Sequence, residues 1–218
     1  MTGKTTLIGK RRSAARKEPR ASYQNRRQEI SEAAVKVFNR LGYNGASLTA
    51  VAAELNVDRA TIYYYFSSKE QLFDEITRAV LEKNLELARK IAESKISPRR
   101  KLREIVTALM VSYGENYPLL YIYIREDLAH VSDARSEWSS SMRRINREIQ
   151  QALVAIIEQG YADDSLRRVG HPNVVASGIL GMLNWTHRWF KPDTSSVSAD
   201  EIGKTYAELV LSGLESPY

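Results

Sequence analysis

Apolar residues at helical spacing recur along most of the chain, and this pattern constrains the fold more than any other feature. The first run places apolar side chains from Ile30 to Leu41 at i, i+3, i+4, i+7, i+8 and i+11, which is one face of a helix. Comparable runs follow within residues 48–55, 72–87, 102–113, 142–157 and 202–214. No segment convincingly shows the alternation of a half-buried strand. Three further helices are expected at about residues 58–65, 119–131 and 173–190. The sequence therefore predicts an all-α protein of about nine helices.

Signals for helix ends lie between these runs. Gly42 is suited to a left-handed cap after the first helix, and Asn56 tolerates the left-handed backbone of a tight turn. Ser47 and Asp58 can each cap a short helix. Further expected helix ends are Ser67 or Ser68 before the fourth helix, Gly160 after the seventh, Phe190 after the eighth, and a Ser198–Glu201 capping box before the ninth.

Positive charge is concentrated at the N-terminal end. Residues 1–29 contain nine Lys or Arg and two acidic residues, a net charge of +7, whereas the whole chain carries +6. A basic end on a nearly neutral body indicates a polyanionic partner at that end. The alternative is a solvated tail that only aids solubility. Residues 1–22 lack helical periodicity and are expected to form a disordered arm.

The composition excludes several classes of protein. Because the chain has no cysteine, disulfides, zinc–thiolate sites and thiol nucleophiles are ruled out. No run approaches the roughly 18 apolar residues of a membrane span and no secretory signal is visible, so we expect a cytoplasmic protein without a membrane partner. The common hydrolase and phosphate-loop motifs are absent too. We therefore expect no enzymatic activity, no cofactor and no metal site.

The two short helices expected within about residues 47–65 are joined by a tight turn and preceded by a longer helix. The second of such helices can enter the major groove of DNA, which is about 12 Å wide. If Ile62 and Phe66 pack inward, Arg59 and Tyr63 face outward, where an arginine can read guanine and a tyrosine can donate to phosphate. The alternative is a helical subdomain without a DNA role.

The stretch from Leu41 to Leu72 resembles the DNA-binding domain of the TetR family of transcriptional regulators. The matching features are Gly42 with the aromatic residue after it, Ser47, the core from Val57 to Tyr63, Tyr65-Phe66, and Ser68-Lys69-Glu70. The resemblance covers about 50 residues from Gln24 and implies a homodimer of nine or so helices that binds DNA. Asn56 replaces the usual turn glycine. Asp58 replaces the usual cap serine, and its charge is expected to weaken DNA binding locally.

These observations predict three regions: a basic arm at residues 1–22, a helix-turn-helix domain at 23–72, and a ligand-binding and dimerisation domain at 73–218. The basic arm can reach the adjacent minor groove or the phosphates. Lys69, on the first turn of its helix, is suited to bind a phosphate. The expected DNA contacts are Ser47, Thr49, Arg59, Ala60, Thr61, Tyr63, Tyr64, Tyr65 and Lys69.

A ligand pocket in the C-terminal domain is implied by the family resemblance. Aromatic residues gather within 113–125 and 185–190, beside polar side chains suited to orient a ligand. The alternative is that the aromatic side chains belong to the hydrophobic core and that the arginines lie on the surface. The expected ligand contacts are Tyr121, Tyr123, Arg125, Asn184, Trp185 and Arg188.

The stretch from Asn184 to Pro192, together with residues 121–127, is similar to regulators of fatty-acid and steroid catabolism, several of which respond to acyl-CoA thioesters. This resemblance implies an effector of acyl-CoA type, with Arg188 at its anionic part. The last two helices are expected to form the dimer interface, because Gly178 and Gly181 allow close approach of a partner helix. Leu180, Leu183 and the apolar stripe of the ninth helix would supply the apolar area.

Three hypotheses follow. The first is a ligand-responsive repressor that binds palindromic double-stranded DNA as a homodimer and is released by a small apolar or acyl-CoA-type effector. The second is a ligand-independent DNA-binding protein whose C-terminal body only dimerises. The third is a carrier or enzyme that has borrowed the fold and binds no specific DNA. A pocket of several hundred Å³ would favour the first over the second, which predicts a packed core.

Overall fold

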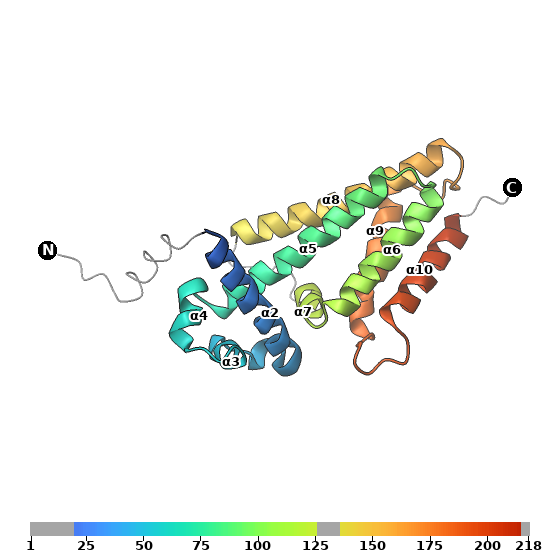
Figure 1. Ribbon diagram of the computed structural model, residues 1–218. Coiled ribbons are helices and arrows are strands. Elements are labelled where there is room, and N and C mark those ends of the chain that lie inside the picture. The colour runs from blue at the N-terminus through green and yellow to red at the C-terminus, as the bar shows by residue number, and fades with distance from the viewer. Residues whose placement is uncertain (1–19, 126–135, 215–218) are drawn as a thin grey trace. The chain divides into compact units, whose positions relative to one another are not determined.

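The computed structural model of the protein describes residues 20–125 and 136–214. Over these residues the chain forms nine α-helices, one short 3₁₀ helix and no strand (Figure 1). The all-α prediction is therefore confirmed. The chain divides after Thr77 into two compact units, and α5 (Lys69–Glu93) has residues in both.

The first unit contains α2 (Arg20–Gly45), α3 (Leu48–Glu54), α4 (Arg59–Tyr65) and the first turns of α5. Its core is built from the predicted apolar faces, and Ile62 and Phe66 are both completely buried, as expected. The other buried members include Ile30, Ala34, Val37, Phe38, Leu48, Val51, Leu72 and Phe73.

The end of α2 differs from its prediction in two respects. Gly42 has a positive φ of 68°, which favours glycine, but its ψ of 172° makes it a kink inside α2 instead of a left-handed cap, and the helix continues to Gly45. In addition, Leu41 is 45% exposed instead of buried. The reason is that the ring of Tyr43 lies against Phe38 and Phe73, with ring centroids 6.0 and 4.9 Å away, so Tyr43 is the residue that covers this part of the core. α2 also begins at Arg20, within the predicted arm; Arg20 and Ala21 both favour helix.

The second unit contains the rest of α5 with α6 (Pro98–Glu115), α7 (Leu119–Arg125), α8 (Ser136–Ala162), α9 (Pro172–Trp185) and α10 (Ala199–Leu214). A 3₁₀ helix, Thr186–Arg188, follows α9, so α9 ends before the predicted Phe190. One continuous core joins these helices. On α5 its members are Leu81, Leu85, Ala88 and Ile91, and the predicted Leu87 is 36% exposed because the buried stripe turns to face α6 and α8.

Most predicted helix ends of both units are confirmed. Ser68, not Ser67, caps α5 by accepting a hydrogen bond from the Gln71 amide at 3.1 Å. Ser198 and Glu201 exchange the two bonds of a capping box, at 3.1 and 3.0 Å. Gly160 does not end its helix. It lies inside α8, where a Cβ atom would be 2.5 Å from Leu166 Cγ, so the close packing of Leu166 explains the glycine.

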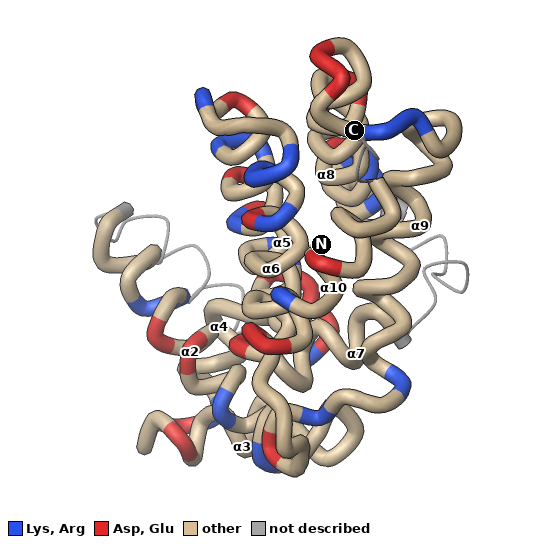
Figure 2. Tube along the Cα trace, turned by 90° about the vertical axis from the view of Figure 1, so that its right-hand side faces the viewer, with Lys and Arg blue, Asp and Glu red and all other residues tan. Residues whose placement is uncertain are grey.

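Lys and Arg are interspersed with Asp and Glu along long helices such as α5 and form no single block, whereas α9 carries no charged residue (Figure 2). This distribution agrees with the nearly neutral charge of the chain beyond residue 29. Among the described residues, no helix is both long and apolar enough to cross a membrane.

Candidate nucleic-acid interface and ligand pocket

The turn between α3 and α4 is fixed by three local interactions. Ser47 Oγ accepts a hydrogen bond from the Ala50 amide at 3.1 Å and so caps α3. Asn56 has a φ of 53°, which places it in the left-handed region, and Asp58 Oδ1 accepts from the Thr61 amide at 3.0 Å to cap α4. Because each cap satisfies one free amide at the start of its helix, the two short helices are held as a helix-turn-helix.

α4 has one buried side and one side open to solvent. Arg59 and Ala60 are exposed, as are Ser47 and Thr49 at the start of α3, whereas Thr61 is half-buried. The expected DNA contacts on α3 and on the first turn of α4 are thus accessible. Arg59 Nη2 donates to the Tyr63 hydroxyl at 2.7 Å, and its guanidinium lies 4.8 Å from the ring centroid of Tyr63.

The tyrosines of α4 and Lys69 are more buried, and make more contacts within the protein, than the sequence suggests. Tyr63, Tyr64 and Tyr65 are all half-buried, and the ring of Tyr65 lies 5.0 Å from that of Tyr23 on α2. Lys69 Nζ donates to the Tyr43 carbonyl at 2.8 Å and lies 4.3 Å from the Tyr43 ring centroid. Its ammonium therefore already connects α5 to the end of α2.

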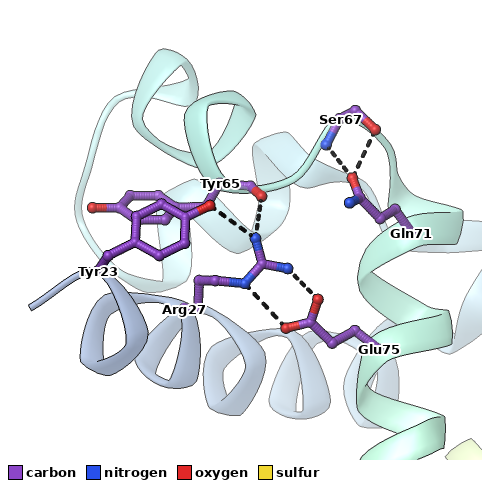
Figure 3. A network of polar contacts seen from close by, with 6 residues as sticks. All are labelled: Tyr23, Arg27, Tyr65, Ser67, Gln71 and Glu75. Atoms are coloured by element: carbon purple, nitrogen blue, oxygen red, sulfur yellow. Dashed lines mark hydrogen bonds and ion pairs between the residues drawn. The ribbon is translucent and has the colours of Figure 1, made fainter. Parts of the chain in front are cut away.

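Arg27 is a residue whose role the sequence did not indicate. It was counted among the basic residues of the N-terminal end, yet its side chain is only 15% exposed and pairs with Glu75 on α5. Its guanidinium also bonds to Tyr23 and to the Tyr65 carbonyl (Figure 3). Burial alone would lower the pKa of Arg27, but the hydrogen bonds with Glu75 and Tyr23 outweigh it and raise the pKa.

The second unit contains a partly open cavity of about 540 Å³ among α5, α6, α7, α8 and α9. Its walls are mainly apolar on α5, α6 and α7, where Leu81, Met110 and Leu120 are buried, although the buried amide of Asn84 on α5 also lines it. Polar side chains gather on α8 and at the end of α9. They are Arg143, Asn146, Arg147, Gln150 and Asn184.

Two of the expected ligand contacts, Tyr123 and Asn184, line this cavity. Tyr123 is held by Asn146, whose Nδ2 donates to the Tyr123 hydroxyl at 2.9 Å, and burial is the main cause of the raised pKa of Tyr123. Tyr121 does not line it and lies against Tyr117, with ring centroids 5.7 Å apart. The side chain of Arg125 lies outside the described residues.

Trp185 and Arg188 are not among the cavity residues either. Trp185 is 62% exposed, and the Arg188 guanidinium stacks 5.1 Å from its ring centroid. α9 ends at Trp185, and the 3₁₀ helix that follows has a different periodicity, so the side chains beyond it leave the face of α9 that lines the cavity.

Sequence reasoning missed the polar side chains of α8. Arg143, Asn146, Arg147 and Gln150 follow the spacing i, i+3, i+4 and i+7, which is a second stripe beside the apolar one of Met142, Ile145 and Ile149. A polar stripe that adjoins the buried face of a core helix was the available signal. In the described parts of the chain, no group of three or more His, Asp or Glu is arranged to hold a metal ion.

Comparison with known proteins agrees with this architecture. The family model "Bacterial regulatory proteins, tetR family" matches residues 30–76, and "Tetracyclin repressor-like, C-terminal domain" matches residues 95–214. The transcriptional repressor KstR2 of Rhodococcus jostii is 27% identical over 194 residues, which is 88% of this chain and 93% of that protein.

Solved structures show the same fold. The TetR-family regulator PfmR of Thermus thermophilus superposes with a TM-score of 0.73 at 29% identity, over 86% of this chain and 99% of that one. The regulator FadR of Bacillus subtilis, solved in complex with stearoyl-CoA, gives a TM-score of 0.68 at 19% identity, over 86% and 99% of the two chains. With both family models matched in chain order and the helix-turn-helix formed as described, the chain belongs to the TetR family of bacterial regulatory proteins.

Proposed function

We propose that the protein is a ligand-responsive transcriptional repressor, which binds palindromic operator DNA as a homodimer and is released by a small amphipathic effector of acyl-CoA type. Its place of action would be the bacterial cytoplasm, where the chromosome lies. The DNA-binding residues would be those expected from the sequence, with Arg59 reading a base and Thr49, Tyr63 and Tyr64 contacting the phosphate backbone.

The observation that carries the DNA-binding proposal is the two-sided character of α4. Ile62 and Phe66 are completely buried, while Arg59 and Ala60 are exposed at the start of the same short helix. An arginine and a small residue at the N-terminal end of a recognition helix allow the helix to approach base edges closely. Repression, and not activation, is supported by the names of the KstR2 relatives.

The effector proposal rests on the cavity of the second unit. Its volume of about 540 Å³ lies within the range of roughly 300–1,000 Å³ that is typical of small-molecule sites. The apolar walls suit an acyl or alicyclic group, and Arg143 and Arg147, both exposed and both at the cavity, suit an anionic end. The complex of the similar FadR structure with stearoyl-CoA supports the same ligand class.

The cavity also favours this hypothesis over the ligand-independent one, since a body that only dimerises has no need of an internal space of this size. In the proposed mechanism, the effector binds more tightly to the form that cannot bind DNA. That difference in affinity is what shifts the population, because a ligand with equal affinity for both forms shifts nothing.

The test is operator binding by the purified protein, measured at two salt concentrations with and without a panel of acyl-CoA thioesters. We expect specific binding to DNA from the upstream region of its own gene, which weakens as salt rises and is released by at least one thioester. Specific binding that no thioester affects would support the role as a DNA-binding regulator and refute the acyl-CoA class of effector. Equal binding to every DNA would refute the operator proposal and favour the borrowed-fold hypothesis.

The cavity arginines provide a sharper test of the effector. Arg147→Ala should weaken thioester binding by about tenfold, since a hydrogen bond to a charged group contributes roughly 1.5–3 kcal/mol, and should leave operator affinity unchanged. Arg144→Ala is the matched control: Arg144 is a neighbour on α8 that pairs with Glu148 at 2.8 Å and does not line the cavity. Equal thioester affinities of the two variants, measured by calorimetry, would contradict an anion site at Arg147.

A further inference from the structure

The Arg27 guanidinium connects three helices of the first unit. Its Nε donates to Glu75 Oε1 on α5 at 3.1 Å, and its Nη2 pairs with the other carboxylate oxygen. Its Nη1 donates to the Tyr65 carbonyl of α4 at 2.7 Å and to the Tyr23 hydroxyl of α2 at 3.1 Å (Figure 3). Four hydrogen bonds therefore converge on one side chain of α2.

The bond to Tyr65 lies at the C-terminal end of α4. Tyr65 is the last residue of α4, and the last carbonyl groups of a helix have no partner within the helix. A cation at this end also interacts favourably with the helix dipole. The guanidinium lies 4.2 Å from the ring centroid of Phe66, the residue that buries this end of α4 in the core.

The bond to Glu75 connects the same end of α4 to α5. Glu75 lies in the second turn of α5, the helix that continues beyond the first unit as far as Glu93. The turn between α4 and α5 is fixed as well, because the Ser67 amide and hydroxyl both donate to Gln71 Oε1 at 2.7 Å. The C-terminal end of α4 is thus held to α5 by a short turn and by Arg27.

We propose that Arg27 is a positioning residue for operator recognition, because its guanidinium sets the C-terminal end of α4 against α2 and α5. This inference rests on the proposed function. In this proposal Arg27 does not itself contact DNA. A displacement of the first turns of α5 alters α4 through the bonds of Arg27 to Glu75 and Tyr65.

Replacing Arg27 by lysine distinguishes this positioning role from an effect of positive charge alone. Arg27→Lys keeps the positive charge but lacks the planar fork that bonds a carboxylate through two atoms and a carbonyl at the same time. The matched control is Arg26→Lys, since Arg26 is the neighbouring residue and pairs within α2, with Glu29 at 2.5 Å. Three quantities are measured for each variant: affinity for operator and for unrelated DNA of equal length, amide hydrogen exchange of α4 without DNA, and the melting temperature.

We expect Arg27→Lys to bind the operator about tenfold more weakly while its affinity for unrelated DNA stays nearly constant, because the net charge is retained. Exchange of the amides in residues 61–66 should be several-fold faster than in the parent, with α3 unchanged. Arg26→Lys should match the parent in all three. Should Arg27→Lys fail to fold, Glu75→Gln replaces it. This variant should show a smaller loss of operator affinity and a smaller increase in the amide exchange of α4.

Unchanged exchange in α4 would overturn the proposal, whatever the DNA result. So would an equal loss of affinity for operator and unrelated DNA with normal exchange, which would identify Arg27 as a phosphate contact. If the parent protein shows no operator preference at all, the proposed function fails, and the exchange of α4 still decides whether Arg27 positions this helix.

Discussion

Arg59 is the residue on which sequence recognition is expected to depend most. It is exposed at the first position of α4, and its guanidinium rests against Tyr63 in the absence of DNA. An arginine that bonds guanine through two nitrogens contributes roughly 1–3 kcal/mol of discrimination between bases. Its internal contact with Tyr63 holds the guanidinium on the open side of α4.

Arg59→Ala should therefore reduce the preference for operator over unrelated DNA by about tenfold or more, measured by competition binding. Arg40→Ala is the control, since it removes an exposed arginine of the same unit that pairs with Glu54 at 2.9 Å. A uniform loss of affinity for all DNA sequences would instead mean that Arg59 contacts the phosphate backbone.

Asp58 has two opposing effects at the residue scale. Its carboxylate caps α4, yet it places a negative charge at the end of the helix that we propose approaches DNA. Asp58→Ser keeps a capping oxygen and removes the charge, so affinity for operator and unrelated DNA should both rise, by roughly threefold at low salt. Asp58→Ala, which loses the cap as well, should lower the melting temperature. If Asp58→Ser leaves DNA affinity unchanged at low salt, Asp58 lies away from the phosphates.

At the scale of elements, α6 and α10 pack closely because of a glycine. A Cβ atom on Gly203 would lie 2.8 Å from the Thr107 Cα atom of α6, a backbone contact that cannot yield by rotation of a side chain. Gly203→Ala should therefore separate the two helices and cost roughly 1–3 kcal/mol, seen as a lower melting temperature. Gly170→Ala is the matched control, since a Cβ there has no neighbour within 4 Å. Equal melting temperatures of the two variants would show that α10 adjusts without cost.

The whole molecule has an apolar surface that a dimer would cover. Val174 and Trp185 of α9 are 69% and 62% exposed, Gly178 and Gly181 have open space around them, and Leu209 of α10 is 60% exposed. The expected contribution of Leu183 is wrong, since it is only 7% exposed and belongs to the core of its own chain. The proposed interface therefore consists of the outer face of α9 with Leu209.

Leu209→Glu should convert the dimer to a monomer, because a charge at a closed apolar interface has no partner, and operator affinity should fall with it. Light scattering coupled to gel filtration gives the mass. Val197→Glu is the control, since Val197 is 41% exposed in the loop before α10. A dimer that survives Leu209→Glu would place the interface elsewhere.

By itself, the sequence determined the features that depend on residues close together in the chain. The helix stripes, the caps at Ser47 and Asp58, the turn at Asn56 and the capping box at Ser198 all arise from contacts within about four residues, so local residue types were sufficient to predict them. The resemblance to the TetR family rests on the same local pattern.

Only the tertiary structure decided which side chains meet across the fold. Arg27 and Glu75 are 48 residues apart, and the cavity takes its wall from five helices, so neither could be read from local spacing. Exposed and buried positions on a helix look alike in a sequence, which is why Leu41 and Leu87 were expected to be buried but are exposed. The burial of a helix face depends on which other helices pack against it, and this depends on the fold of the whole chain.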